Sequence, residues 1–345
     1  MAEFDFKGYD NFVLENKIES ILATKLDMNR FMTADYSLAE APGMVKKIHR
    51  YSASGEVDDL TRGEGNTHFI DAEYSEEEYR VARDQGQIRY YDDDVMTDPV
   101  LIDTKVQGLS ESMVNAWTKK AIAEYGKTDN MAEFTNWGLA DWADAIAIYS
   151  NKFENQEGLF CLASMDLVPQ IRKSLGDYLK YTEAYIRTGA IGEVLGVPIY
   201  TSKALPKNTM FIANKDAVHA FIKKGVFVEQ DRDIDTKLNN IVATRYSVIA
   251  LVDDRKCIMC GKAQSVDASV STATKATYKI AGAATTGAKV HAFVNGVEVG
   301  TPVVAASNAY EITIEDALVA GDKVKVRADL EGFIKSYSDE FVVAA

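Results

Sequence analysis

The longest run of helical periodicity in the chain covers residues 97–125. Apolar residues recur there every three or four positions, which places them along one side of a helix. Asp98 suits the N-cap, Pro99 the first helical position and Gly126 the position after the last turn. The pattern predicts a helix of about 27 residues, roughly 40 Å long. Its apolar stripe consists of Ile102, Val106, Leu109, Met113, Trp117 and Ala121.

An extended pattern precedes this helix. Residues 44–51 read as a strand, a polar and glycine-rich stretch follows, and residues 78–82 and 87–91 read as strands again. This excursion of about 50 residues has no core of its own, and a two-stranded hairpin is not stable alone in water. We therefore expect it to lie against a neighbouring subunit.

Residues 1–36 read as an arm. Aromatic residues appear there before any segment long enough to form a core, and a helical stripe includes Phe12 and Ile18. An arm that buries these groups on another part of the protein, or on another subunit, explains the pattern.

The segment after the long helix alternates helices and strands. A second helix carries Trp142 on its apolar face, and a third helix stops at Gly176. A further helix is predicted at 215–224. Strands are predicted at 158–163, in the turn-rich region 188–207, and at 210–213, 226–229, 244–252 and 256–260.

The composition changes at about Lys262. Residues 264–345 are rich in Ala, Val, Thr and Gly, and Asn295-Gly296 is a strong hairpin signal. A second turn is predicted at 320–322. About seven short strands in this region are typical of a β-sandwich. The clearest of them are 278–280, 290–294, 310–314, 323–328 and 341–343.

Charge argues against a dedicated nucleic-acid binder. The formal net charge is −14, and residues 56–94 hold 13 acidic residues against four arginines. The apolar stretches are too short to span a bilayer, and residues 1–10 do not resemble a secretory signal, so we expect no membrane association and a protein that stays in the cytosol until lysis.

No motif in the chain predicts catalysis. Walker, G-x-G-x-x-G and G-x-S-x-G sequences are absent, and the histidines are scattered. Cys257 and Cys260 form a single C-x-x-C pair within a strand, which favours a structural role. The acids at 229–235 lack the glycine of a calcium loop, and those at 92–94 read as a solvated turn. We expect no enzyme, cofactor or metal.

The order of these parts resembles a known family. An arm, an acidic β-excursion, a long helix and a strand-rich return near Cys260 resemble the major capsid proteins of tailed bacteriophages, which have the Hong Kong 97-like fold. The α/β region adds the sequence Gly192-Glu-Val-Leu-Gly-Val-Pro-Ile-Tyr-Thr-Ser-Lys-Ala-Leu-Pro206. The resemblance covers roughly residues 1–262, and the remainder resembles a bacterial Ig-like domain.

This resemblance implies an α+β fold in six parts. They are an N-arm (1–36), an E-loop (37–96), the spine helix of a P-domain (97–131), an A-domain (132–225), P-domain return strands (226–262) and the Ig-like domain (263–345).

The resemblance also implies partners. The protein would form hexamers and pentamers with itself, with scaffolding, portal and decoration proteins as further partners, and would enclose double-stranded DNA without sequence-specific contacts. It would be assembled in the host bacterial cytoplasm and reside in the virion capsid. Scaffolding would be a separate protein or removed by prior processing.

Individual residues are expected at the contacts. Because residues 48–104 contain no lysine, we predict that subunits are not cross-linked through the E-loop. On the Ig-like domain, Tyr310, Phe333 and Tyr337 are candidates for contact with host surfaces or glycans. Inter-subunit contacts are expected at Phe12, Ile18, Arg62, Arg80, Arg83 and Trp117.

Three alternatives remain at this stage. An encapsulin-like nanocompartment would share the fold and enclose an enzyme instead of DNA. Another Ig-bearing phage structural protein, such as a tail tube subunit, would be mostly β, which the long helix at 97–125 opposes. A secreted adhesin would need a signal sequence.

Overall fold

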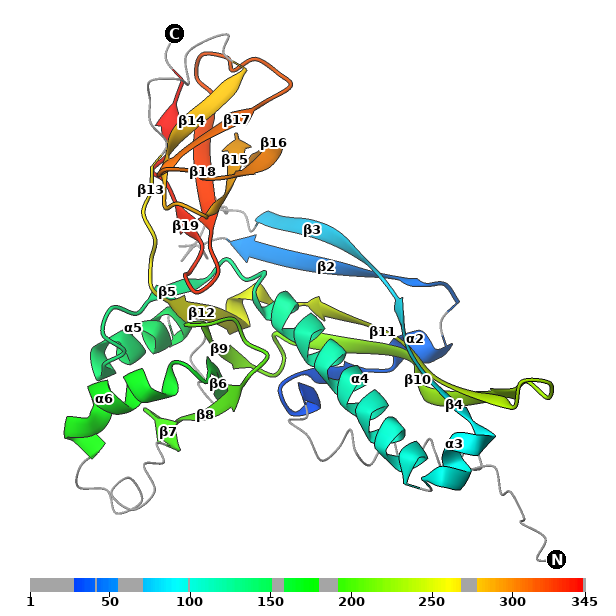
Figure 1. Ribbon diagram of the computed structural model, residues 1–345. Helices are drawn as coiled ribbons and strands as arrows, with labels where there is room; N and C mark the ends of the chain where they lie inside the picture. Colours follow the sequence, from blue (N-terminus) through cyan, green and yellow to red (C-terminus); the bar gives the residue numbers. More distant parts are fainter. Residues whose placement is uncertain are drawn as a thin grey trace, which may run out of the picture. The chain divides into compact units, whose positions relative to one another are not determined.

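The computed structural model divides the chain into two compact units (Figure 1). The first comprises Met1–Glu124 with Lys215–Asp253, and the second comprises Tyr125–Asn214 with Asp254–Ala345. Residues described by the structure are 28–40, 42–54, 71–98, 100–150, 158–179, 192–267 and 278–343.

A four-stranded sheet forms the centre of the first unit. Its strand order is β1-β10-β11-β4, with β1 parallel to β10 and the other neighbours antiparallel. A separate two-stranded sheet is formed by β2 and β3. The elements of this unit are η1 (Met28–Arg30), β1 (Thr33–Asp35), α2 (Ser37–Glu40), β2 (Val45–Ser54), β3 (Asp71–Arg80), β4 (Ala82–Tyr91), α3 (Asp92–Thr97), α4 (Leu101–Tyr125), β10 (Val218–Arg232) and β11 (Leu238–Leu251).

The long helix α4 packs on one face of this sheet. All six residues of the predicted stripe are buried. The first four of them, from Ile102 to Met113, pack in one cluster with Ile88, Val228 and Ile241. The helix begins at Leu101, and the Asp98 carboxylate accepts a hydrogen bond of 3.0 Å from the N–H of Val100. Its C-terminus directly precedes Gly126, as predicted. Pro99 lies outside the described residues.

Alternation along β11 assigns its two faces. Ile241 and Ala243 belong to the core under α4, whereas Tyr246, Val248 and Ala250 belong to a second cluster. Because successive side chains of a strand point to opposite faces, the two clusters lie on opposite sides of the sheet. The second cluster contains Ile48 and Tyr79 from the base of the β2–β3 hairpin, together with Leu38, Val81 and Phe221.

The second unit begins with an α/β layer. Its six-stranded sheet has the order β5-β12-β9-β6-β8-β7, and β6 is buried at every position. Trp142, predicted on the apolar face of this helix, is buried in α5 together with Ile146 and Tyr149. The elements are β5 (Met131–Glu133), α5 (Leu139–Ser150), β6 (Leu159–Ser164), α6 (Val168–Leu179), β7 (Glu193–Val194), β8 (Val197–Ser202), β9 (Met210–Asn214), η2 (Asp254–Lys256) and β12 (Cys257–Gly261).

The C-terminal region of this unit is all β. Two sheets, β13-β14-β17 and β16-β15-β18-β19 with β20 on β18, enclose one apolar core. The Asn295-Gly296 turn joins β15 to β16 as predicted, with positive φ at both residues. The strands are β13 (Val266–Asp267), β14 (Lys279–Ala284), β15 (Lys289–Val294), β16 (Val297–Val304), β17 (Ala309–Thr313), β18 (Lys323–Asp329), β19 (Ser336–Tyr337) and β20 (Phe341–Val342).

The structure differs from three of the sequence predictions. Residues 215–224 are not a helix, because Val218–Ile222 pair with Ser247–Leu251 in an antiparallel ladder. The helix α6 continues past Gly176 to Leu179. The acids at 92–94 form the short helix α3 instead of a solvated turn, and Asp92 is buried.

The compact units also differ from the predicted domain boundaries. Residues 215–225, assigned to the A-domain, lie in the first unit as part of β10. Residues 254–262, assigned to the P-domain return, lie in the second unit because β12 pairs with β5 and β9. Within the predicted E-loop, β4 pairs with β11 in the central sheet.

Candidate assembly surfaces

The β2–β3 hairpin of the first unit forms a sheet of its own, separate from the four-stranded sheet. Ten residue pairs connect its strands, from Val45 opposite Arg80 to Ser54 opposite Asp71. In the described part of the chain, no third strand continues this ladder. A two-stranded ribbon without further support is marginally stable in water, so its stability depends on what its base and its faces contact.

Packing and a cation hold the base of this hairpin. Ile48 and Tyr79 are buried against Phe221. The ammonium group of Lys46 lies 4.8 Å from the centroid of the Phe221 ring and donates to the hydroxyl of Ser37 at 3.1 Å. Nζ of Lys223 donates to the carbonyl of Gly43 at 2.6 Å. These contacts fix the direction in which the hairpin leaves the sheet.

Opposite charges face each other across the two strands of this hairpin. Nζ of Lys47 lies 2.5 Å from Oε1 of Glu76 and 2.9 Å from Oε1 of Glu78. These hydrogen bonds raise the pKa of Lys47, and the bond from Lys47 lowers the pKa of Glu76. Because all three side chains are at least one-third exposed, the pairs contribute little to stability but favour this register over its neighbours.

A second surface lies where α3 meets the β10–β11 turn. Asp92 accepts hydrogen bonds from Nη2 of Arg232 at 2.5 Å and from Nδ2 of Asn239 at 2.6 Å. Burial alone would raise the pKa of Asp92, but these hydrogen bonds outweigh burial and the pKa is lowered. Apolar side chains are exposed in α3, in the residues that flank it and in the β10–β11 turn, and they are Tyr91, Met96, Val100 and Ile234.

Known proteins resemble this chain in sequence over a short stretch and in fold over a longer one. No protein-family model matches the chain. Over 74 residues the chain is 34% identical to the major capsid protein of Staphylococcus phage phiMR11, a stretch that is 21% of this chain and 27% of that protein. The match therefore spans about a quarter of that relative.

Solved structures match over a longer part of the chain. The capsid of cyanophage P-SCSP1u matches with a TM-score of 0.52 at 15% identity, covering 68% of this chain and 87% of that one. The mature capsid of bacteriophage PhiM1 matches with a TM-score of 0.52 at 11% identity, covering 68% and 86%. The chain has the tailed-phage major capsid protein fold. A structure from Mycobacterium phage Che8 matches it with a TM-score of 0.51 at 16% identity, covering 63% and 84%.

The structure corrects one predicted contact of this capsid fold. Trp117, expected between subunits, is 5% exposed and packs inside the first unit against Arg245. Arg80 and Arg83 are exposed, as an intermolecular contact requires. Phe12, Ile18 and Arg62 lie outside the described residues.

The aromatic residues predicted to contact host surfaces or glycans make contacts within the second unit instead. Tyr310 is 5% exposed and belongs to the core of the β-sandwich, so it cannot stack on a sugar. Phe333 is partly buried and forms a β-bridge with Lys262. The hydroxyl of Tyr337 donates to Asp129 at 3.2 Å. The prediction for Tyr310 was therefore wrong, and the other two residues lie at the junction of the sandwich with the α/β layer.

That junction is a set of contacts which the sequence did not reveal. Lys335 donates to the carbonyls of Lys127 at 3.1 Å and Thr128 at 3.0 Å. The N–H of Ile334 donates to the carbonyl of Lys262 at 3.0 Å. Burial lowers the pKa of Lys335, although the charge of Asp129 opposes this effect. The sandwich is thus attached at two points, the linker after β12 and the loop before β19.

Other candidate chemistry has structural surroundings. The thiols of Cys161, Cys257 and Cys260 are buried and free, and burial raises the pKa of each above its ordinary value. Within the described residues no group of three potential metal ligands is found. Among the helices that the structure describes, none is long and apolar enough to cross a membrane.

Proposed function

We propose that the chain is the major capsid protein of a tailed bacteriophage. Copies would form hexamers and pentamers and close into an icosahedral shell around double-stranded DNA. The observation that carries this proposal is the capsid fold together with its separate two-stranded β2–β3 hairpin. A two-stranded hairpin gains stability when a neighbouring subunit covers it, and binding of this kind stabilises the folded state by mass action.

Charge supports the enclosure of DNA without tight binding. The net charge of −14 means that the chain as a whole does not compensate phosphate charge. A shell of such subunits would enclose DNA without binding it tightly. Scaffolding, portal and decoration proteins are proposed as further partners, with assembly in the host cytoplasm and no covalent cross-linking through the lysine-free segment 48–104.

We assign the C-terminal sandwich as an Ig-like domain displayed outside the shell. Two antiparallel sheets around one apolar core support this assignment. Its density of short strands and its hairpin turns are those of Ig-like sandwiches. In this arrangement residues 1–262 would build the shell and residues 263–345 would face outward.

Electron microscopy of the purified protein tests the proposal. The full chain, expressed alone and with a candidate scaffolding protein from the same phage, should form closed shells of icosahedral symmetry. A chain that ends at Lys262 should form shells without surface knobs. Nuclease-protected DNA in particles from infected cells would support the capsid role, whereas a protein cargo would indicate a nanocompartment. Rigid tubes would contradict both roles.

A further inference from the structure

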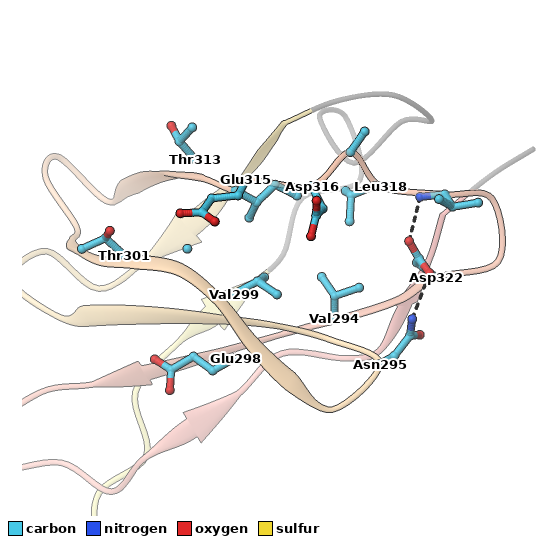
Figure 2. A pocket seen from close by; sticks show the side chains of 14 residues that line it. Val294, Asn295, Glu298, Val299, Thr301, Thr313, Glu315, Asp316, Leu318 and Asp322 are labelled. Atoms are coloured by element: carbon cyan, nitrogen blue, oxygen red, sulfur yellow. Dashed lines mark hydrogen bonds between the residues drawn. The ribbon is translucent and has the colours of Figure 1, made fainter.

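The β-sandwich contains a groove that the proposed shell does not use. Its volume is about 650 Å³, and it lies between β16 and the segment that follows β17 (Figure 2). Thr301, Thr313 and Glu315 lie toward one end in Figure 2, and Asn295 and Asp322 lie toward the other. The volume is in the range of small-ligand and peptide pockets.

A glycine allows the groove to close at the end that contains Thr301 and Thr313. Gly300 has a φ of 72°, and a Cβ on this residue would lie 2.5 Å from the carbonyl oxygen of Thr313. The register of β15 and β16 shifts beside it, from Ala292 opposite Val299 to Val290 opposite Val303. The two sheets therefore approach closely here because residue 300 has no side chain.

Hydrogen bonds close the other end. The Asp322 carboxylate accepts from Nδ2 of Asn295 at 2.9 Å and from the N–H of Val319 at 2.7 Å. The N–H of Lys323 donates to Oδ1 of Asn295 at 3.0 Å. These contacts tie the β15–β16 turn to the β17–β18 segment, so the groove exists before any ligand binds.

The lining is apolar below and acidic at the rim. Val294 and Val299 are half-buried, and Ile314 and Leu318 beneath them are buried. Val319 is 61% exposed, which leaves an apolar side chain at the mouth. The fourteen lining residues include no Lys, Arg or His, and the acidic ones are Glu298, Glu315, Asp316 and Asp322.

Among the described residues, two of these acids differ from the other two in having no recorded partner. Glu298 pairs with His291 at 2.6 Å, and Asp322 is held by Asn295. Glu315 and Asp316 are exposed and make no hydrogen bond or ion pair within the described residues. The rim therefore favours a cationic ligand and opposes anionic polymers.

The groove also lies beside open sheet edges. β16 is the last strand of its sheet, and β17 is the last strand of the other. In the ordering of the described strands, each has a hydrogen-bonded neighbour on one side only. An unpaired edge beside an apolar groove is the arrangement that binds an extended peptide by adding a strand.

We propose that this groove binds an extended segment of a partner protein in which basic and apolar residues alternate. The segment would pair with the edge of β16, place its apolar side chains over Val294 and Val299, and direct its basic side chains to Glu315 and Asp316. This binding uses only the β-sandwich and does not depend on shell assembly.

Fluorescence anisotropy with the full-length protein tests the proposal. The probe is a labelled peptide of about eight residues that alternates lysine and valine. The E315K/D316K variant should bind it about tenfold more weakly than the wild type. The E331K/D339K variant is the matched control, because it makes the same change in net charge at exposed residues outside the groove, and it should bind like the wild type.

Two further probes use the wild-type protein alone. A peptide that alternates glutamate and valine should not bind, and the lysine peptide N-methylated at alternate residues should lose its affinity. The proposal is overturned if the lysine peptide does not bind, if the control variant weakens binding as much as the groove variant, or if N-methylation has no effect.

Discussion

The guanidinium of Arg245 lies over the indole ring of Trp117, with its central carbon 3.8 Å from the ring centroid. Nη2 of Arg245 also lies 3.4 Å from Oδ2 of Asp84, and Asp84 forms an ion pair with Lys120. Burial lowers the pKa of Arg245, and the charge of Asp84 opposes this effect. One cation thus joins α4, β11 and β4 at the centre of the first unit.

Removing the indole should destabilise this unit. Trp117→Ala leaves a cavity and uncovers the face of a buried cation, so we expect the free energy of unfolding to fall by about 3–5 kcal/mol. Trp117→Phe keeps a ring under Arg245 and should cost about half as much. Denaturant titration followed by circular dichroism measures both. Equal losses in the two variants would show that the ring face is not what Arg245 requires.

Close approach of α4 to β4 should depend on Gly86. A Cβ on this residue would collide with Cδ1 of Leu109, which is buried. Gly86→Ala should therefore cost about 1–3 kcal/mol, because Leu109 must move within a packed core. In the G86A/L109A double variant this collision is absent, so its loss should be smaller than the sum of the two single losses. Additive losses would contradict the proposed contact.

Acid should weaken the contact between α3 and the β10–β11 turn. A carboxylate whose pKa is lower in the folded state stabilises that state above the unfolded pKa, and this contribution disappears as the pH falls through the folded pKa. Because the pKa of Asp92 lies below its ordinary value of 3.8, its contribution is complete at neutral pH and is lost below 3.8.

The Asp92→Asn variant checks this. It should be less stable than the wild type by about 1 kcal/mol at neutral pH, and the difference should close as the pH falls below 3.8. Asp93→Asn is the control, because the Asp93 side chain is exposed and makes none of these contacts. If the difference in unfolding free energy between Asp92→Asn and the wild type does not change with pH, ionisation of Asp92 does not stabilise the folded state.

Charge reversal in the hairpin should impair assembly more than folding. Lys47→Glu places a third carboxylate beside Glu76 and Glu78, which disfavours the present register of β2 and β3. Lys47→Arg keeps the charge and is the control. We expect similar thermal unfolding for both variants, but a several-fold lower yield of shells for Lys47→Glu in sedimentation assays. Wild-type yield from Lys47→Glu would show that hairpin register does not limit assembly.

The sequence was most informative where one periodicity had one interpretation. The stripe from Ile102 to Ala121 predicted α4, and the Asn295-Gly296 turn predicted the β15–β16 hairpin. The prediction of a helix at 215–224 was wrong because Ala217, Ala220 and Phe221 also fit helical spacing. The segment is a strand because it pairs with β11, which is distant in the sequence. Local pattern cannot contain that information.

The contact residues were harder to predict for a related reason. A buried face has the same sequence pattern whether it packs on its own chain or on a neighbour, so Trp117 was placed between subunits although it covers Arg245. Alternation in β17 did not reveal which face of the strand is exposed, and Tyr310 is on the buried one. The groove depends on Gly300, whose positive φ has no local sequence signal.

The two-point attachment of the sandwich at Lys262 and Lys335 has a consequence for recognition. If every copy holds its sandwich in one orientation, a shell presents its grooves at intervals set by the lattice. A partner with several basic strands at a matching interval then makes its later contacts intramolecularly, which raises avidity by about 10²–10⁴ without any new interaction. A partner with a single basic strand gains no avidity. The affinity of the particle for a partner would therefore depend on the spacing between the basic strands of that partner.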